Sequence, residues 1–253
     1  MPPATLRQAV LAQVVAATAA TNAVYSSLFW PNVITFPVLY FGDPTTARFA
    51  TFGVNPSADE FRNGRWPVHI TVPQLDHRSA RYFNNSVPPN DWFEGYEDTR
   101  NNANALNLLG YSYRRDAVHI DLTPRATIAA ETITKNPVSK RLFLQMISAD
   151  VRWFFSAIAL CSNLKGAIMS GTVTNEYYFD ELVKKLLPSG YSLNVNIRFG
   201  AGRGATTLYD FSGPSFSIPV LFCRKSPSDR KNKGAFIAAE VARTMPQLKA
   251  AGF

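Results

Sequence analysis

Short apolar runs alternate with amphipathic stretches along most of the chain. The runs predict buried strands at Thr35–Tyr40, Phe49–Val54, Ala117–Leu122, Gly166–Gly171, Tyr191–Phe199 and Ser217–Cys223. Apolar residues at helical spacing predict helices at Leu6–Ala20, Gln74–Phe83, Ala103–Leu109, Val138–Leu160, Glu176–Leu187 and Ala235–Leu248. Strands that alternate with helices favour an α/β fold with a mainly parallel sheet. We therefore expect residues 1–253 to form a single domain, a three-layer α/β/α sandwich around a twisted sheet.

The sharpest junction in this pattern follows the strand at 49–54. Asn55-Pro56 ends the apolar run, and Ser57, Asp59 and Glu60 are typical of a helix start. Such a junction places polar groups at the carboxyl edge of the sheet, where open α/β folds bind ligands. The alternative interpretation is an ordinary turn between a strand and a helix.

Two further strand ends carry polar residues. The strand at 117–122 presents His119 and Asp121 on one face, because alternate strand residues point the same way. The last strand leads into a basic run, Arg224-Lys225-Ser226-Pro227-Ser228-Asp229-Arg230-Lys231-Asn232-Lys233-Gly234. Pro67–Asp98 is polar and weakly periodic, which indicates a functional loop with aromatic anchors, and Gly200–Gly204 indicates a flexible turn.

These strand ends resemble the motifs of the uracil-DNA glycosylase superfamily. Gly53-Val54-Asn55-Pro56-Ser57 is similar to motif A, and is closest to its Gly-x-Asn-Pro-Gly form in the mismatch-specific thymine/uracil branch. Glu60, Gly64 and Trp66 follow with a spacing similar to that of the bacterial thermostable branch. Leu122-Thr123-Pro124-Arg125-Ala126 matches the continuation of the strand that reads uracil. Ser226-Pro227 matches motif B.

The chain departs from the family at three positions. The Asn that reads the uracil edge is absent, so either His119 or Asp121 takes that position. An amide both accepts from uracil N3–H and donates to O4, whereas an ionised carboxylate only accepts. Arg224 replaces the catalytic His of motif B, and Ser228 replaces its wedge Leu.

The resemblance implies a role for each matched residue. Asn55 orients the attacking water, and Arg224, or Lys225, stabilises the uracil anion. Trp66 stacks on the extruded base, with Phe61 as the second choice, and core packing is the alternative for both. Gly53 and Val54 line the uracil pocket. The implied DNA contacts are Ser57, Arg203, Lys225, Ser226, Ser228, Arg230, Lys231 and Lys233, although a solvated basic loop is the alternative for this run.

Composition adds three constraints. The net charge of +8 and the sequence pI near 9.6 favour a polyanionic partner. Two cysteines, Cys161 and Cys223, lie in apolar runs, and three histidines without ligand spacing predict neither a metal site nor a cofactor. Gln8 and Gln13 interrupt the N-terminal apolar stretch, which favours a helix over a signal peptide. No segment reaches the roughly 20 apolar residues that span a membrane.

The sequence therefore predicts a cytoplasmic, monomeric, monofunctional uracil-DNA glycosylase. Its substrate is uracil-containing DNA, and its products are free uracil and an abasic site. The alternative is a non-catalytic or weakly catalytic binder of uracil or abasic DNA. A nucleotide-binding α/β protein unrelated to repair is disfavoured, because no Gly-x-Gly-x-x-Gly follows a strand and opens a helix.

Overall fold

A six-stranded sheet forms the centre of the molecule. The computed structural model describes residues 3–61, 66–85, 91–98, 104–174, 176–225 and 234–253. The strand order in the sheet is β2-β1-β3-β8-β7-β6, and a separate two-stranded ladder pairs β4 with β5. The ladders β2/β1, β1/β3 and β3/β8 are parallel, whereas β8/β7 and β7/β6 are antiparallel. The predicted mainly parallel sheet is thus confirmed, with an antiparallel extension on one side.

The strands differ in length and in burial. Their bounds are β1 Phe49–Gly53, β2 Ala117–Asp121, β3 Gly166–Ser170, β4 Thr172–Thr174, β5 Tyr177–Tyr178, β6 Ser192–Phe199, β7 Thr206–Gly213 and β8 Phe216–Cys223. Every residue of β1, β2 and β3 is buried. Parallel strands covered by helices on both faces need such continuous apolar sequences, which explains why these strands were predictable.

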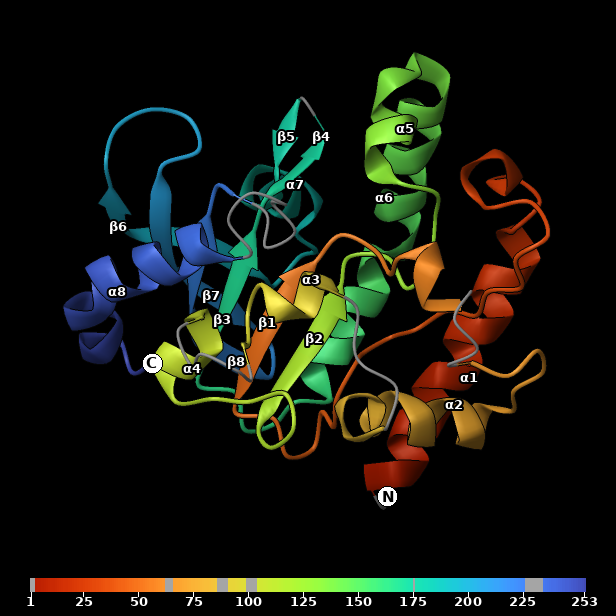
Figure 1. Ribbon diagram of the computed structural model, residues 1–253, viewed down its shortest axis with the longest axis horizontal. Helices are drawn as coiled ribbons and strands as arrows, with labels where there is room; N and C mark the ends of the chain where they lie inside the picture. Colours follow the sequence, from red (N-terminus) through yellow and green to blue (C-terminus); the bar gives the residue numbers. More distant parts are fainter. Residues whose placement is uncertain (1–2, 62–65, 86–90, 99–103, 175, 226–233) are drawn as a thin grey trace.

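Helices cover the sheet on both sides. The α-helices are α1 Pro3–Thr21, α2 Val72–Ala80, α3 Asp91–Glu94, α4 Ala105–Leu109, α5 Ala130–Lys135, α6 Pro137–Ala159, α7 Phe179–Leu186 and α8 Ala235–Ala250, and short 3-10 turns occupy Ser26–Leu28, Ala58–Phe61 and Tyr82–Asn84. In Figure 1, α4 and α8 lie in front of the sheet and α6 runs behind it. This arrangement is compatible with the predicted three-layer α/β/α sandwich.

The long helix α6 is a core element. The Asn136 side chain accepts hydrogen bonds from the backbone N–H groups of Val138 and Ser139, at 2.9 and 3.1 Å, and Pro137 takes the first helical position. By length and composition α6 is the one helix, within the described residues, that reaches membrane-spanning values. Because 56% of its apolar window is buried inside the fold, it fits the core helix of a soluble protein.

Several sequence predictions need correction. Thr35–Tyr40 forms no strand, and the neighbouring Phe41 makes only an isolated bridge to His119. Within the polar region 67–98, the helix predicted at Gln74–Phe83 is present as α2 with the bounds Val72–Ala80, and α3 was not predicted. The strand β7 was not predicted, although its Thr, Tyr and Phe residues are good strand formers directly after the 200–204 turn. Both cysteines are buried free thiols, as predicted.

Candidate functional site at the carboxyl edge of the sheet

The carboxyl ends of the four parallel strands bring the predicted site residues to one edge. Gly53 at the end of β1 is the register partner of Asp121 at the end of β2. On the other side, Ser170 at the end of β3 is paired with Cys223 at the end of β8. Beyond the strands, the N–H groups of Leu122 and Thr123 donate to the carbonyls of Gly53 and Val54, so the two chain segments continue side by side.

Gly53 makes room for the Asp121 and His119 side chains. A Cβ atom added at Gly53 would lie 2.3 Å from Asp121 Oδ1 and 2.7 Å from His119 Nε2. Any larger residue at position 53 would therefore collide with both side chains. The glycine of the predicted motif is required here by this close approach, since its backbone has no left-handed conformation.

His119 connects Asp121 to a buried chain of hydrogen bonds. His119 Nε2 lies 3.1 Å from Asp121 Oδ1, and His119 Nδ1 lies 2.9 Å from Thr51 Oγ1. Thr51 Oγ1 in turn lies 2.5 Å from the hydroxyl of Tyr113. Burial raises the pKa of Tyr113, which keeps its hydroxyl protonated and able to donate.

One assignment of protons satisfies this whole chain. Tyr113 donates to Thr51, Thr51 donates to His119 Nδ1, and His119 Nε2–H donates to Asp121. In this assignment the imidazole is neutral and its role is to hold the carboxylate. Asp121 Oδ2 has no hydrogen bond to any residue that the structure describes, and the Asp121 side chain is 3% exposed. The structure thus pairs His119 with Asp121 at the end of β2.

Aromatic rings enclose this pair. Trp92 packs against His119 with a ring-centroid distance of 4.4 Å, and Phe93 and Phe41 contact the imidazole from other sides at 5.3 and 5.9 Å. Tyr96 lies beside Trp92 and its hydroxyl is 2.5 Å from Ser170 Oγ. The aromatics of 92–96 therefore anchor this segment over the edge, as predicted. The Tyr96–Ser170 pair at the site was not predicted.

Asn55 is held in one orientation by two acceptors. Its Nδ2 donates to the carbonyl of Pro56 and to Thr127 Oγ1, each at 2.9 Å. Thr127 Oγ1 itself donates its proton to the carbonyl of Ile128 at 2.9 Å, so toward Asn55 it can only accept. Both neighbours thus demand the amide nitrogen on their side. Asn55 Oδ1 points the other way and accepts from no described residue.

The two aromatic residues proposed for base stacking contact each other. Trp66 and Phe61 are stacked with centroids 5.8 Å apart, and Phe61 meets Phe36 edge-on. Trp66 is only 6% exposed, whereas Phe61 is half-buried. Trp66, the first choice from the sequence, is therefore a core residue in this structure, and Phe61 is the ring with accessible surface.

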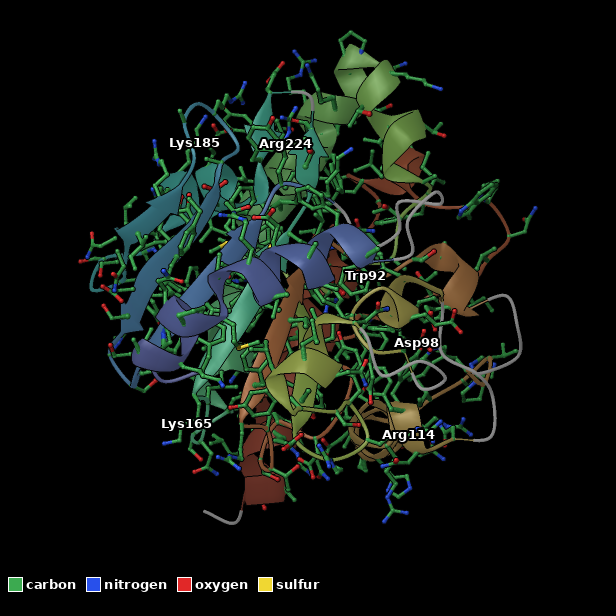
Figure 2. The ribbon with its side chains drawn as sticks, turned by 60° about the vertical axis from the view of Figure 1, so that its left-hand side comes forward. Trp92, Asp98, Arg114, Lys165, Lys185 and Arg224 are labelled. Atoms are coloured by element: carbon green, nitrogen blue, oxygen red, sulfur yellow. The ribbon has the colours of Figure 1, made fainter. Side chains whose placement is uncertain are left out.

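The basic residues lie on the β8 side of the edge. The guanidinium of Arg224 is 5.7 Å from the Tyr178 ring centroid, and Arg203 lies 5.2 Å from the same centroid. Arg203 also forms a 2.8 Å ion pair with Glu181, which lowers the pKa of that carboxyl. Figure 2 shows Arg224 beside the β4–β5 hairpin, apart from Trp92. The structure therefore does not bring Arg224 into contact with Asp121, because β1 and β3 lie between their strands.

The structure describes only some of the other residues that were predicted to contact DNA. Ser57 forms an isolated parallel bridge with Thr127, and Lys225 is exposed. Ser226, Ser228, Arg230, Lys231 and Lys233 lie outside the described residues. Gly234, where α8 begins, lies against the backbone of Gly95, since an added Cβ would meet the Gly95 carbonyl oxygen at 1.9 Å. Of the described ends of the basic run, Arg224 thus lies beside Tyr178 and Gly234 lies against Gly95.

Arg125, part of the second matched motif, has a structural role. It is 5% exposed and forms a two-pronged ion pair with Asp150 of α6, at 2.8 and 3.3 Å. It also donates to the carbonyl of Thr18 and to the Asn22 side chain near the end of α1. Thr123 donates to the same carboxylate at 2.7 Å. These contacts fix the segment that carries Thr127 and hence the orientation of Asn55.

The search for a metal centre and the comparisons add no further assignment. The described part of the chain has no group of three or more His, Cys, Asp or Glu residues arranged to hold a metal ion. Comparison of the chain with protein-family models, with curated proteins and with solved structures finds no match. The resemblance to the uracil-DNA glycosylase superfamily therefore depends on the motif residues alone.

Proposed function

We propose that the chain is an outlying uracil-DNA glycosylase. In the proposed reaction, water attacks C1′ of deoxyuridine, the bond from C1′ to uracil N1 breaks, and the uracil anion leaves and is then protonated. The products are free uracil and an abasic site in DNA. The nucleotide has to leave the base stack to reach the carboxyl edge of the sheet.

The observation that carries this proposal is the fixed acceptor at Asn55. Its Oδ1 faces away from two neighbours that both bind the amide nitrogen. An acceptor held in this way orients a water molecule through one of the water protons without removing it. Because Asn cannot take a proton as Asp does, the rate enhancement must come from positioning and from stabilisation of the leaving group.

Asp121 is the proposed reader of the base. Its Oδ1 is occupied by His119, and Oδ2 is left to accept from uracil N3–H. Uracil O4 then needs donors other than this carboxylate, such as backbone N–H groups. Phe61 takes over from Trp66 as the proposed stacking partner, because it keeps accessible surface.

Arg224 is the proposed cation for uracil O2. It is exposed, and within the described residues it has no acidic partner, only the Tyr178 ring. Three strand spacings separate the ends of β2 and β8, about 14 Å, so an extruded base between Asp121 and Arg224 would bridge the two sides of the edge. Arg224 loses little interaction energy if it moves from the Tyr178 ring to a uracil anion, because exposed cation–π contacts are weak.

A single-turnover assay tests the proposal. A uracil-containing oligonucleotide is incubated with excess protein, and abasic sites are revealed by alkaline cleavage, with a thymine oligonucleotide as the control substrate. Asn55→Ala should lower the rate by roughly 10²-fold, as for the loss of one positioning group, while binding to uracil DNA stays nearly unchanged. Asn194→Ala makes the same chemical change on the exposed strand β6 and should keep the full rate. An unchanged rate in Asn55→Ala would remove the main support for the glycosylase.

A non-catalytic binder of uracil or abasic DNA is the second candidate. It is favoured by the Asn in place of Asp at position 55 and by the absence of His at position 224. In this case the protein prefers uracil or abasic duplexes over thymine duplexes, yet no abasic sites form during prolonged incubation. Asp121→Ala should then lower the binding preference for uracil duplexes, and neither the variant nor the wild type should release uracil.

A further inference from the structure

A polar cleft lies at the end of the parallel strands opposite the candidate site. It encloses about 480 Å³ between α1, α2 and the start of β2. Its lining includes Ala117, the first residue of β2, whereas Asp121 at the carboxyl edge is the last. The cleft is therefore separate from the proposed glycosylase site, and ligand binding in the cleft does not depend on the proposed reaction.

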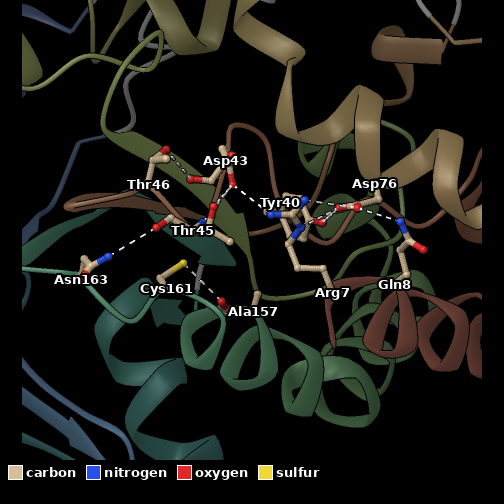
Figure 3. A network of polar contacts seen from close by, with 10 residues as sticks. All are labelled: Arg7, Gln8, Tyr40, Asp43, Thr45, Thr46, Asp76, Ala157, Cys161 and Asn163. Atoms are coloured by element: carbon tan, nitrogen blue, oxygen red, sulfur yellow. Dashed lines mark hydrogen bonds and ion pairs between the residues drawn. The ribbon is translucent and has the colours of Figure 1, made fainter. Parts of the chain in front are cut away.

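The two carboxylates of the cleft are already bound inside the protein. Asp76 is 3% exposed and accepts from Arg7 Nε at 3.0 Å and from the Tyr40 hydroxyl at 2.5 Å. Asp43 accepts from the backbone N–H and the hydroxyl of Thr45, at 3.0 and 2.7 Å, and from Arg7 at 3.3 Å. Figure 3 shows Arg7 between these two carboxylates. The two carboxylates are thus held in place by these hydrogen bonds, and Arg7 largely compensates their negative charge.

The other cations of the cleft are exposed. Arg81, Arg114 and Arg115 join Arg7, so four arginines face two carboxylates and the lining has a net charge of +2 with His77 neutral. Arg81 and Arg114 form no side-chain hydrogen bond or ion pair with a described residue. Among the described residues, Arg115 makes polar side-chain contacts only with the Gly110 carbonyl at 3.0 Å and Asp116 at 4.0 Å. Guanidinium donors are thus left for a ligand, next to two carboxylates whose charge Arg7 already compensates.

We propose that this cleft binds a phosphate group. Guanidinium groups pair with phosphate oxygens through two parallel hydrogen bonds, and several arginines around one concavity match a ligand with several anionic oxygens. The volume lies within the range of small-molecule sites, about 300–1,000 Å³. The lining is dominated by arginine, aspartate, histidine and amide groups, which fits a phosphorylated ligand better than an apolar one. The phosphate comes either from a small phosphorylated molecule such as a nucleotide or from a nucleic-acid backbone.

Calorimetric titration tests the proposal with adenosine 5′-monophosphate, adenosine and inorganic phosphate as probes. The nucleotide should bind more tightly than adenosine, and Arg81→Ala/Arg114→Ala should weaken its binding by roughly tenfold or more, as for the loss of charge-assisted hydrogen bonds. Lys165→Ala/Lys249→Ala removes the same charge from exposed positions outside the cleft and should change binding less than twofold. Both variants change exposed side chains, and thermal melting checks that they are folded.

The source of the phosphate follows from competition. If a uracil-free duplex displaces the nucleotide from the wild-type protein but not from a protein already weakened by Arg81→Ala/Arg114→Ala, the cleft takes backbone phosphates. If the duplex leaves nucleotide binding unchanged, the ligand is a small phosphorylated molecule. Equal binding of adenosine and its monophosphate, full affinity in the arginine variant, or an equal loss in the lysine variant would each overturn the phosphate site.

Discussion

At the scale of single residues, the candidate site depends on Gly53, because this glycine has no side chain to collide with Asp121 and His119. Gly53→Ala would place a methyl group 2.3 Å from Asp121 Oδ1, and overpacking of a buried site costs about 1–3 kcal/mol. We expect Asp121 and His119 to shift, with lower stability in urea unfolding and a lower rate of uracil release. Gly166→Ala is the matched control on β3, since its nearest neighbour is a ring carbon of Phe49 at 3.2 Å. Equal losses in both variants would mean that the contact at Gly53 is not special.

Thr127 controls the orientation of Asn55. Thr127→Val keeps the shape but removes the hydroxyl that accepts from Asn55 Nδ2, so the Pro56 carbonyl alone holds the amide. One net hydrogen bond is worth about 1 kcal/mol, and we expect a roughly fivefold lower single-turnover rate with unchanged DNA binding. Thr127→Ser should restore the rate, because it restores the hydroxyl. A full rate in Thr127→Val would show that the orientation of Asn55 does not limit the reaction.

Asp180 gives the molecule a pH dependence outside the site. Burial is the main cause that raises the pKa of this carboxyl above its usual value of 3.8, although the Tyr209 hydroxyl donates to it at 2.5 Å. A raised folded-state pKa means that Asp180 stabilises the fold at pH below 3.8, and that this contribution is lost as the pH rises through the folded-state pKa. Glu181 has a lowered pKa and the opposite dependence, but it is present in both proteins compared below.

Asp180→Asn removes this titration. The free energy of unfolding of the variant should therefore rise relative to the wild type between pH 3.5 and pH 7. Urea unfolding of both proteins at the two pH values measures the difference. A difference that does not change with pH would contradict the raised pKa.

At the scale of elements, the sequence pattern predicted what burial dictates. β1, β2 and β3 are buried throughout because both faces are covered, and Gly110, with a φ of 80°, follows α4, which ends at Leu109 as predicted. The strand β7 was missed because its TTLYDFSG sequence has no continuous apolar run. The residues at 35–40 have the apolar content of a strand, yet Pro37 removes a backbone donor, and pairing with the edge strand β2 is limited, within the described residues, to the bridge between Phe41 and His119.

The ion pair between Arg125 and Asp150 connects three elements. Arg125→Ala would leave Asp150 buried without its cation, which costs about 3–5 kcal/mol in comparable buried pairs. The double change Arg125→Met/Asp150→Leu should recover most of this loss, because it leaves no buried charge. Arg203→Ala removes the exposed pair with Glu181 and should leave the unfolding midpoint nearly unchanged. Urea unfolding compares all three, and a mild effect of Arg125→Ala would mean that water replaces the lost contacts.

At the scale of the whole molecule, the sequence predicted the residues at the carboxyl edge of the sheet but not the residues that hydrogen-bond to them. Gly53, Asn55 and Asp121 were found because each follows or ends an apolar strand. Thr127 and Tyr113 were not, because their contacts with Asn55 and Thr51 join residues more than 60 positions apart in the sequence. The buried position of Trp66 likewise depends on packing against Phe61, which no local pattern reports.

Two regions of the chain carry clusters of basic residues. The basic run that begins at Arg224 leaves the carboxyl edge, and the arginine cleft lies at the amino ends of the strands. Under the proposed function, DNA contacts the first and not the second. Arg203 already pairs with Glu181, so we do not count it among the free phosphate contacts.

The salt dependence of DNA binding separates these regions. Each cation that meets a phosphate contributes about 0.9 to the slope of log K against log salt concentration. Lys231→Ala/Lys233→Ala should therefore flatten the slope for a uracil-containing duplex by up to about 1.8. Lys165→Ala/Lys249→Ala carries the same change in net charge and should leave the slope unchanged, because a slope counts local phosphate contacts rather than total charge. If the Arg81→Ala/Arg114→Ala protein shows the flattened slope instead, the duplex lies across the amino-end cleft and the basic run is a solvated loop.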